Sequence, residues 1–127
     1  MKTPADRRSN RLAVPSPGDY SPAQRALYRV ITEGPRARES RVVPLVDDDG
    51  RLLGPFAIMP ISPEVGAAVQ SVGAALRFAS RLPADVRELA VLTVAAHAAS
   101  GFEWVAHEAA ARGAGLDDGE LARIRSG

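Results

Sequence analysis

Apolar residues recur every three or four positions over much of the chain, which is the spacing of helices that bury one face. The first such stretch begins at Ser21, and Gln24 stands where it would complete a capping box with that serine. Gly34 follows the last periodic residue and is typical of a helix end. The apolar stripe consists of Leu27, Val30 and Ile31. The pattern predicts a helix over residues 21–33.

Residues 62–79 repeat this pattern. Ser62 precedes Pro63 at the position where a serine caps a helix and a proline fits the first turn. The apolar positions at helical spacing are Val65, Val69, Val72, Leu76 and Ala79. We expect a second helix here, and its many glycines and alanines would allow a neighbouring helix to approach closely.

The stretch from Leu82 to Ala99 predicts a third helix that is apolar on almost every side. A helix of this kind is normally buried all round. Because a chain of 127 residues has little material with which to surround it, we expect it to be buried between subunits.

Two further helices follow a break at Ser100 and Gly101. The fourth covers about 102–112 and is expected to stop at Gly113. The last begins at Asp117, where an acid three residues later completes a capping-box spacing.

The segment 36–61 lacks helical periodicity. An Asp-Gly turn at residues 49–50 lies between two apolar runs and makes a short hairpin possible, whereas Pro44 and Pro55 argue against a central strand. The acidic run 47–49 could suggest calcium, but it lacks the longer ligand pattern of an EF-hand loop, so a solvated turn is favoured. The fold predicted is all-α, with an irregular arm or short hairpin between the first two helices.

The N-terminal residues 1–20 are rich in Arg, Ser and Pro and are expected to form a flexible arm, which leaves 21–127 as one helical domain. Hydrophobic residues make up 46% of the chain and charged residues 24%, as in ordinary globular proteins. The net charge of +1 favours neither nucleic acid nor a membrane surface, and no apolar run is long enough to span a bilayer. The absence of cysteine excludes disulfide chemistry in this sequence and is compatible with a cytoplasmic location.

Candidate chemistry concentrates between Glu88 and His107. On a helix, Glu88 shares a stripe with Leu92, Ala95 and Ala99, so its carboxylate would be partly desolvated and suited to acid–base work. The alternative is an exposed first-turn acid that complements the helix dipole or pairs with nearby Arg87.

Glu103 and His107 lie four residues apart on one helix face. The carboxylate could orient the imidazole and make it a proton shuttle. Two ordinary roles compete: a surface ion pair, or a capping box in which Glu103 bonds back to the backbone of Ser100. His97 should point away from Glu88 and is interpreted as a core or interface histidine, and Trp104 as a packing anchor that could also wall a pocket.

Short motifs for other chemistries are missing from the sequence. It contains no His-Glu-x-x-His and no facial-triad spacing, so no metal site is predicted. No Ser-His-Asp arrangement, P-loop or dinucleotide glycine fingerprint occurs either, and no cofactor is expected.

Several pieces of the chain together resemble the carboxymuconolactone decarboxylase family, which includes the alkylhydroperoxidase D-like proteins. The pieces are residues 21–28, 50–56, 62–65, Leu82-Pro83, 87–90, Phe102-Glu-Trp-Val-Ala-His107 and Ala114-Gly-Leu-Asp117. The resemblance implies an all-α fold and assembly into trimers or hexamers. Members of this layout continue past the position of Gly127, so it also implies a member that is short at its C-terminus.

The peroxidase branch of that family carries Glu, two cysteines and His at positions that correspond here to Glu88, Ser100, Glu103 and His107. Because serine and glutamate cannot cycle through a disulfide, thiol peroxidase activity is disfavoured. The resemblance points instead to a cofactor-free acid–base enzyme of the lyase, decarboxylase or isomerase type that acts on a small organic acid or lactone.

The expected catalytic residues are Glu88, Glu103 and His107, with Phe56, Trp104 and Ser100 as substrate-binding residues. A non-catalytic oligomeric helical protein that has lost the family chemistry is the alternative.

Overall fold

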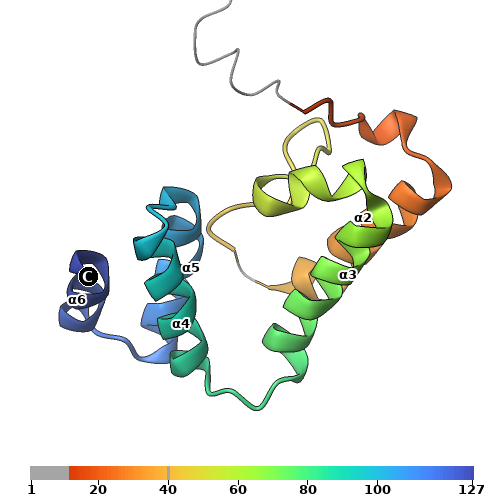
Figure 1. Ribbon diagram of the computed structural model, residues 1–127. Coiled ribbons are helices and arrows are strands. Elements are labelled where there is room, and N and C mark those ends of the chain that lie inside the picture. The colour runs from red at the N-terminus through yellow and green to blue at the C-terminus, as the bar shows by residue number, and fades with distance from the viewer. Residues whose placement is uncertain (1–11, 40) are drawn as a thin grey trace, which may run out of the picture. The chain divides into compact units, whose positions relative to one another are not determined.

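The computed structural model describes residues 12–39 and 41–127, and Figure 1 shows that they form an all-α fold. Within the described ranges the regular elements are helices, and the β-type contact is an isolated antiparallel bridge between Val46 and Leu52. The described residues group into two compact units, one of residues 12–39 and 44–78 and one of residues 41–43 and 79–127. Each has its own core. The first eleven residues of the expected N-terminal arm lie outside the described residues.

The first unit is built on helix α2 (Pro22–Glu33). The capping box at its start is present as expected, because Ser21 accepts from the Gln24 N–H and the Gln24 side chain accepts from the Ser21 N–H. A short 3-10 helix η1 (Pro17–Asp19) precedes it and leads to Tyr20, whose buried ring contacts Tyr28 edge-on. Leu27, Ile31 and Leu52 form the core of the unit.

The irregular segment after α2 contains the expected tight turn. Asp47 Oδ1 accepts the N–H groups of Asp49 and Arg51, and the Val46–Leu52 bridge closes the hairpin. Two 3-10 helices, η2 (Pro35–Arg38) and η3 (Gly54–Ile61), were not apparent from the sequence. A 3-10 helix has three residues per turn, so its apolar residues do not follow the α-helical spacing used to predict the other helices.

Helix α3 (Pro63–Ala74) continues as one π-helical turn, η4 (Ala75–Ala79), so the predicted helix over 62–79 is confirmed. The expected cap at Ser62 is wrong, because the Ser62 side chain makes no capping hydrogen bond. The prediction of close packing is confirmed at Gly66, where a Cβ atom would lie 2.6 Å from the Met59 carbonyl oxygen.

The second unit is a helical hairpin of α4 (Ala84–His97) and α5 (Gly101–Ala114), followed by α6 (Asp118–Ser126), which packs on α4 (Figure 1). Its core contains Leu92, Trp104, Ala111, Leu116 and Leu121. Helix α5 passes through Gly113, which was expected to end it, and stops at Gly115 in the left-handed region. The Asp117–Glu120 capping box predicted for the last helix is present.

Within the described chain α4 is buried on one face, and the expected burial of its other faces between subunits stays a prediction. Its buried residues are Glu88, Leu92 and Ala95, whereas Val94 is 67% exposed and Val86 and Leu89 are exposed as well. Within residues 12–39 and 41–127, every helix is too short or too polar to cross a membrane.

Candidate functional site

The turn between α4 and α5 decides which side chains of the hairpin meet. The Ala99 N–H donates to the Ala96 carbonyl at 3.0 Å and the Ser100 N–H to the Ala95 carbonyl at 2.8 Å, which is a Schellman helix end. Ala99 adopts a φ of 51° there, a left-handed conformation that glycine normally supplies. The chain reverses at this point, and α5 runs back along α4.

Glu88 is buried by this arrangement, with 1% of its surface exposed. It lies on the same face of α4 as Leu92 and Ala95, so the predicted stripe is confirmed for these residues, whereas Ala99 lies beyond the helix and is exposed. The alternative of an exposed acid is wrong, but its pairing with Arg87 is present. The Arg87 Nε donates to Glu88 Oε1 at 3.3 Å. A buried carboxylate needs such partners, because desolvation of an unpaired charge costs several kcal/mol, on the order of the net stability of a small domain.

The second oxygen of Glu88 pairs with His107. Glu88 Oε2 lies 2.7 Å from His107 Nδ1. Ala98 is ten residues after Glu88 and nine before His107, so the two residues are about equally far from the turn and come face to face on neighbouring helices. Because a carboxylate only accepts, the hydrogen bond places the proton on Nδ1 and leaves Nε2 of the neutral imidazole as the basic nitrogen.

Glu103 approaches His107 from the opposite side of the ring. Its Oε2 lies 3.5 Å from His107 Nε2, which is within ion-pair distance when the imidazole is protonated but long for a hydrogen bond. The imidazole therefore stands between a buried carboxylate on Nδ1 and a partly exposed one near Nε2.

Ser100 fulfils only half of the expected capping box. Its Oγ accepts from the Glu103 N–H at 3.4 Å. The Ser100 N–H already donates to the Ala95 carbonyl in the Schellman turn, so the Glu103 carboxylate is not required by the Ser100 backbone and can face His107.

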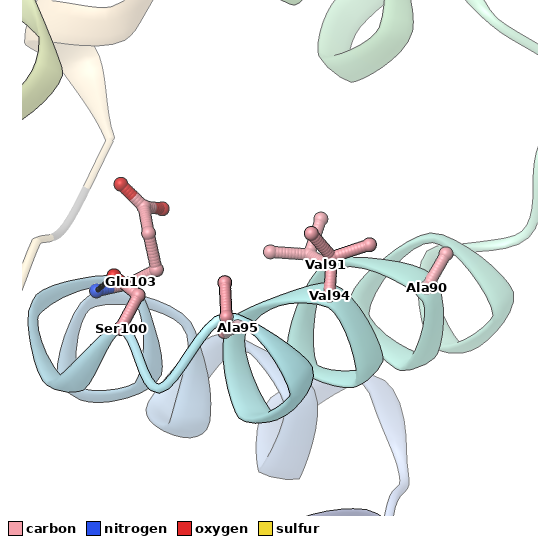
Figure 2. Close-up of a pocket in the computed structure, with 7 residues that line it drawn as sticks. Ala90, Val91, Val94, Ala95, Ser100 and Glu103 are labelled. Carbon is pink, nitrogen blue, oxygen red and sulfur yellow. Dashed lines mark hydrogen bonds between the residues drawn. The ribbon is translucent and has the colours of Figure 1, made fainter.

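An open groove lies along the exposed face of α4 and ends at Ser100 and Glu103 (Figure 2). The side chains of Val91, Val94 and Glu103 project from the helices toward the same side in that view. The groove is lined by Ala90, Val91, Val94, Ala95, Ala98, Ser100 and Glu103. Its wall is thus apolar, with a carboxylate at one end.

Trp104 is a core residue of the second unit. It is 5% exposed, its Nε1 donates to Glu108 Oε2 at 3.1 Å, and the Arg125 guanidinium lies 4.9 Å from the ring centroid. It does not line the groove beside Glu103, so of its two expected roles the structure assigns the packing anchor.

Phe56 belongs to the first unit, where it packs against the core of Leu27, Ile31 and Leu52. The Arg36 guanidinium lies 5.1 Å from its ring centroid. His97 is exposed in the last turn of α4, so it is not a core histidine, and the interface role expected as the alternative stays a prediction. Among the described residues, no group of three or more His, Cys, Asp or Glu side chains is arranged to hold a metal ion.

The sequence reasoning missed the direct pairing of Glu88 with His107. It assigned the orienting role to Glu103, because a spacing of four residues on one helix is visible in a sequence. A pairing across a helix turn becomes visible only when the turn position is known. The break at Ser100-Gly101 indicates where the turn lies, and residues equally distant from a turn face each other in a helical hairpin.

Comparison with known families agrees with this architecture. The model of the carboxymuconolactone decarboxylase family matches residues 63–126, which is half of the 127-residue chain. The chain belongs to the carboxymuconolactone decarboxylase family. The match covers α3 to α6 and includes Glu88, Glu103 and His107. Neither the curated proteins nor the solved structures contain a match to the chain.

Proposed function

We propose that this carboxymuconolactone decarboxylase family protein is a cofactor-free acid–base enzyme that acts on a small organic acid or lactone. The reactions that such an enzyme would catalyse are decarboxylation, isomerisation or lactone ring opening. The observation that carries the proposal is the hydrogen bond of 2.7 Å between His107 Nδ1 and the buried Glu88 carboxylate.

In the proposed mechanism Glu88 is the positioning residue. Its carboxylate holds the imidazole in the tautomer that bears the proton on Nδ1 and stabilises the imidazolium that forms when Nε2 takes a proton. His107 Nε2 is the general base, because it is the ring nitrogen directed away from Glu88. Glu103 stands within 3.5 Å of that nitrogen, where it can receive or return the transferred proton.

Thiol peroxidase chemistry is not proposed. The family's two cysteine positions hold Ser100 and Glu103, and the sequence contains no cysteine. Neither an alcohol nor a carboxylate forms the disulfide that this chemistry needs.

The test is a turnover screen with small lactones and unsaturated or keto acids, monitored by NMR. His107→Gln should lower turnover of any hit by about a hundredfold to ten-thousandfold, the range for loss of a general base. His97→Gln is the matched control, because that histidine is exposed and outside the site. Equal activity of both variants, or no turnover by the wild type across the screen, would sink the proposal.

Assembly into a homo-oligomer, a trimer or a hexamer, is part of the same proposal. Its support is an exposed apolar stripe on α3 and η4 at alternating spacings of four and three residues. The stripe comprises Val65, Val69, Val72 and Leu76. Light scattering decides the point, and a monomer at all concentrations would remove this part of the proposal.

The alternative is an oligomeric helical protein without catalysis. The same exposed stripe favours it, because an assembly surface requires no chemistry at Glu88 or His107. In that case His107→Gln should change stability and leave no turnover to be lost.

A further inference from the structure

Arg87 and Glu88 are neighbours in α4, and such neighbours on a helix normally point to different sides. The Arg87 side chain nonetheless reaches the buried carboxylate, since its Nε donates to Glu88 Oε1 at 3.3 Å. Its side chain is 22% exposed, against 48% for that of Arg112 in α5. The guanidinium is therefore held at the carboxylate and is less exposed to solvent than a surface arginine.

Glu88 divides its two carboxylate oxygens between a cation and a base. Oε1 accepts from Arg87, and Oε2 lies 2.7 Å from His107 Nδ1. Burial disfavours the charged form of a carboxyl group, whereas a cation in hydrogen-bond contact favours it. Because Glu88 is 1% exposed, the interactions that keep it ionised come from protein partners and not from water.

The charge of Glu88 decides how readily the pair of Glu88 and His107 takes up a proton. With Glu88 ionised and one proton on Nδ1, Nε2 keeps its lone pair and can accept a proton from a substrate. If Glu88 were less stable as an anion, the pair would take up a second proton from water at a higher pH. Nε2 would then carry a hydrogen whether the other proton lay on Nδ1 or on Oε2, and it could not act as a base.

The other charged groups on the packed helices are placed differently. Glu103 adds a second carboxylate, 3.5 Å from Nε2 of the imidazole. Glu108 binds Arg112 and the Trp104 ring nitrogen, and Arg125 of α6 covers the Trp104 ring. The guanidinium on α4 thus opposes the attraction that the two flanking carboxylates exert on a proton at the ring.

We propose that Arg87 is a positioning residue of the proposed reaction, which keeps Glu88 ionised and thereby keeps His107 Nε2 free to accept a proton. This role rests on the proposed function, because it matters for catalysis only if His107 is the general base. Arg87 acts through Glu88 and needs no contact with the substrate.

Titration of the His107 imidazole by ¹⁵N NMR tests this role in the full chain and needs no substrate. The chain has two histidines, so His97→Gln leaves His107 as its one imidazole. In this background, Arg87→Gln should raise the pH at which Nε2 takes up its proton by about one to three pH units, the effect expected from loss of a cation beside a carboxylate. Arg87→Lys keeps the charge and should recover most of the original titration.

Two further variants separate the position of Arg87 from its charge. Arg81→Gln removes the same charge from an exposed residue of the second unit and should leave the titration unchanged. Glu88→Gln removes the carboxylate, so Arg87→Gln should shift the titration little in that background. If Arg87→Gln alone does not fold, adding Glu88→Gln should restore folding, because the buried charge that required the guanidinium is then gone.

Turnover gives a second readout once the screen yields a substrate. Arg87→Gln should lower kcat at neutral pH and recover it at higher pH, with KM little changed, because the variant loses the free base and not the binding of substrate. A merely structural role of Arg87 would lower kcat at every pH. Arg81→Gln should keep the original pH profile.

The role of Arg87 would be overturned by an unshifted His107 titration in Arg87→Gln or by an equal shift in Arg81→Gln. A shift of full size in the Glu88→Gln background, or an unfolded Arg87→Gln that Glu88→Gln does not rescue, would overturn it as well. Failure of the proposed function looks different. No turnover by the wild type would remove that function, whereas the expected titration shift would still show that Arg87 controls the proton on His107.

Discussion

Ala99 and Gly115 occupy the same position in two successive helix ends. Each follows its helix in a Schellman turn, with φ of 51° at Ala99 and 109° at Gly115. Glycine adopts such angles without steric cost, whereas alanine brings its Cβ too close to the following carbonyl, at a cost of about 1–2 kcal/mol. The turn that brings Glu88 to His107 is therefore the strained one of the two.

Ala99→Gly should stabilise the second unit by about 1 kcal/mol, because relief of the strained φ exceeds the extra entropy that glycine has in the unfolded chain. Gly115→Ala should destabilise it by a similar amount, since no atom lies within 4 Å of the added Cβ and only the backbone angle opposes it. Urea unfolding followed by Trp104 fluorescence measures both. A destabilised Ala99→Gly would mean that the turn does not hold the left-handed angle.

Glu88 and His107 should be energetically coupled. In a double-mutant cycle with Glu88→Gln and His107→Gln, we expect a coupling free energy of about 1–3 kcal/mol, because the carboxylate is buried and the contact is short. The cycle of Glu103→Gln with His107→Gln is the control. Its coupling should stay below about 0.5 kcal/mol, since that pair is 3.5 Å apart and the Glu103 side chain is 34% exposed. Equal couplings would contradict the geometry of the site.

Tyr20 should make stability fall in alkali. Burial, with a smaller effect of Tyr28, raises the pKa of the Tyr20 hydroxyl above its usual value of 10.0. The folded state therefore holds the proton more tightly than the unfolded chain. This contribution is fully present below pH 10.0 and is lost as pH rises through the folded pKa. Urea unfolding at increasing pH measures the decline, and Tyr20→Phe should reduce its slope. An identical slope in the variant would rule Tyr20 out as the cause.

Arg36 should stabilise the first unit through its planar group. Its guanidinium carbon lies 5.1 Å from the Phe56 ring centroid and 5.8 Å from that of Phe78, and its Nε donates to Gln70 at 3.4 Å. Lysine keeps the charge but loses the stacking plane, so Arg36→Lys should cost about 1–2 kcal/mol. Near-ultraviolet circular dichroism of the tyrosines follows the first unit. Trp104 fluorescence reports the second unit and should be unchanged at equal denaturant.

The sequence by itself determined the helices. Capping residues such as Ser21 and Asp117 and the apolar spacing within each helix act over three or four positions, and all five predicted α-helices are present. The same short-range reasoning placed Glu88 on the stripe with Leu92 and Ala95, which is the buried face of α4. Capping residues and apolar spacing did not predict the 3-10 helix over 54–61, and they placed the end of α5 too early.

Only the tertiary structure decided which side chains meet. Glu88 and His107 are nineteen residues apart, and their contact depends on where the chain reverses and how α4 rotates against α5. The groove depends on the face of α4 that α5 and α6 leave open, and the hydrophobicity of α4 on nearly all sides could not identify that face. Helix formation is set by local backbone bonding, whereas the site arises from packing between helices, which a periodic pattern on one helix does not encode.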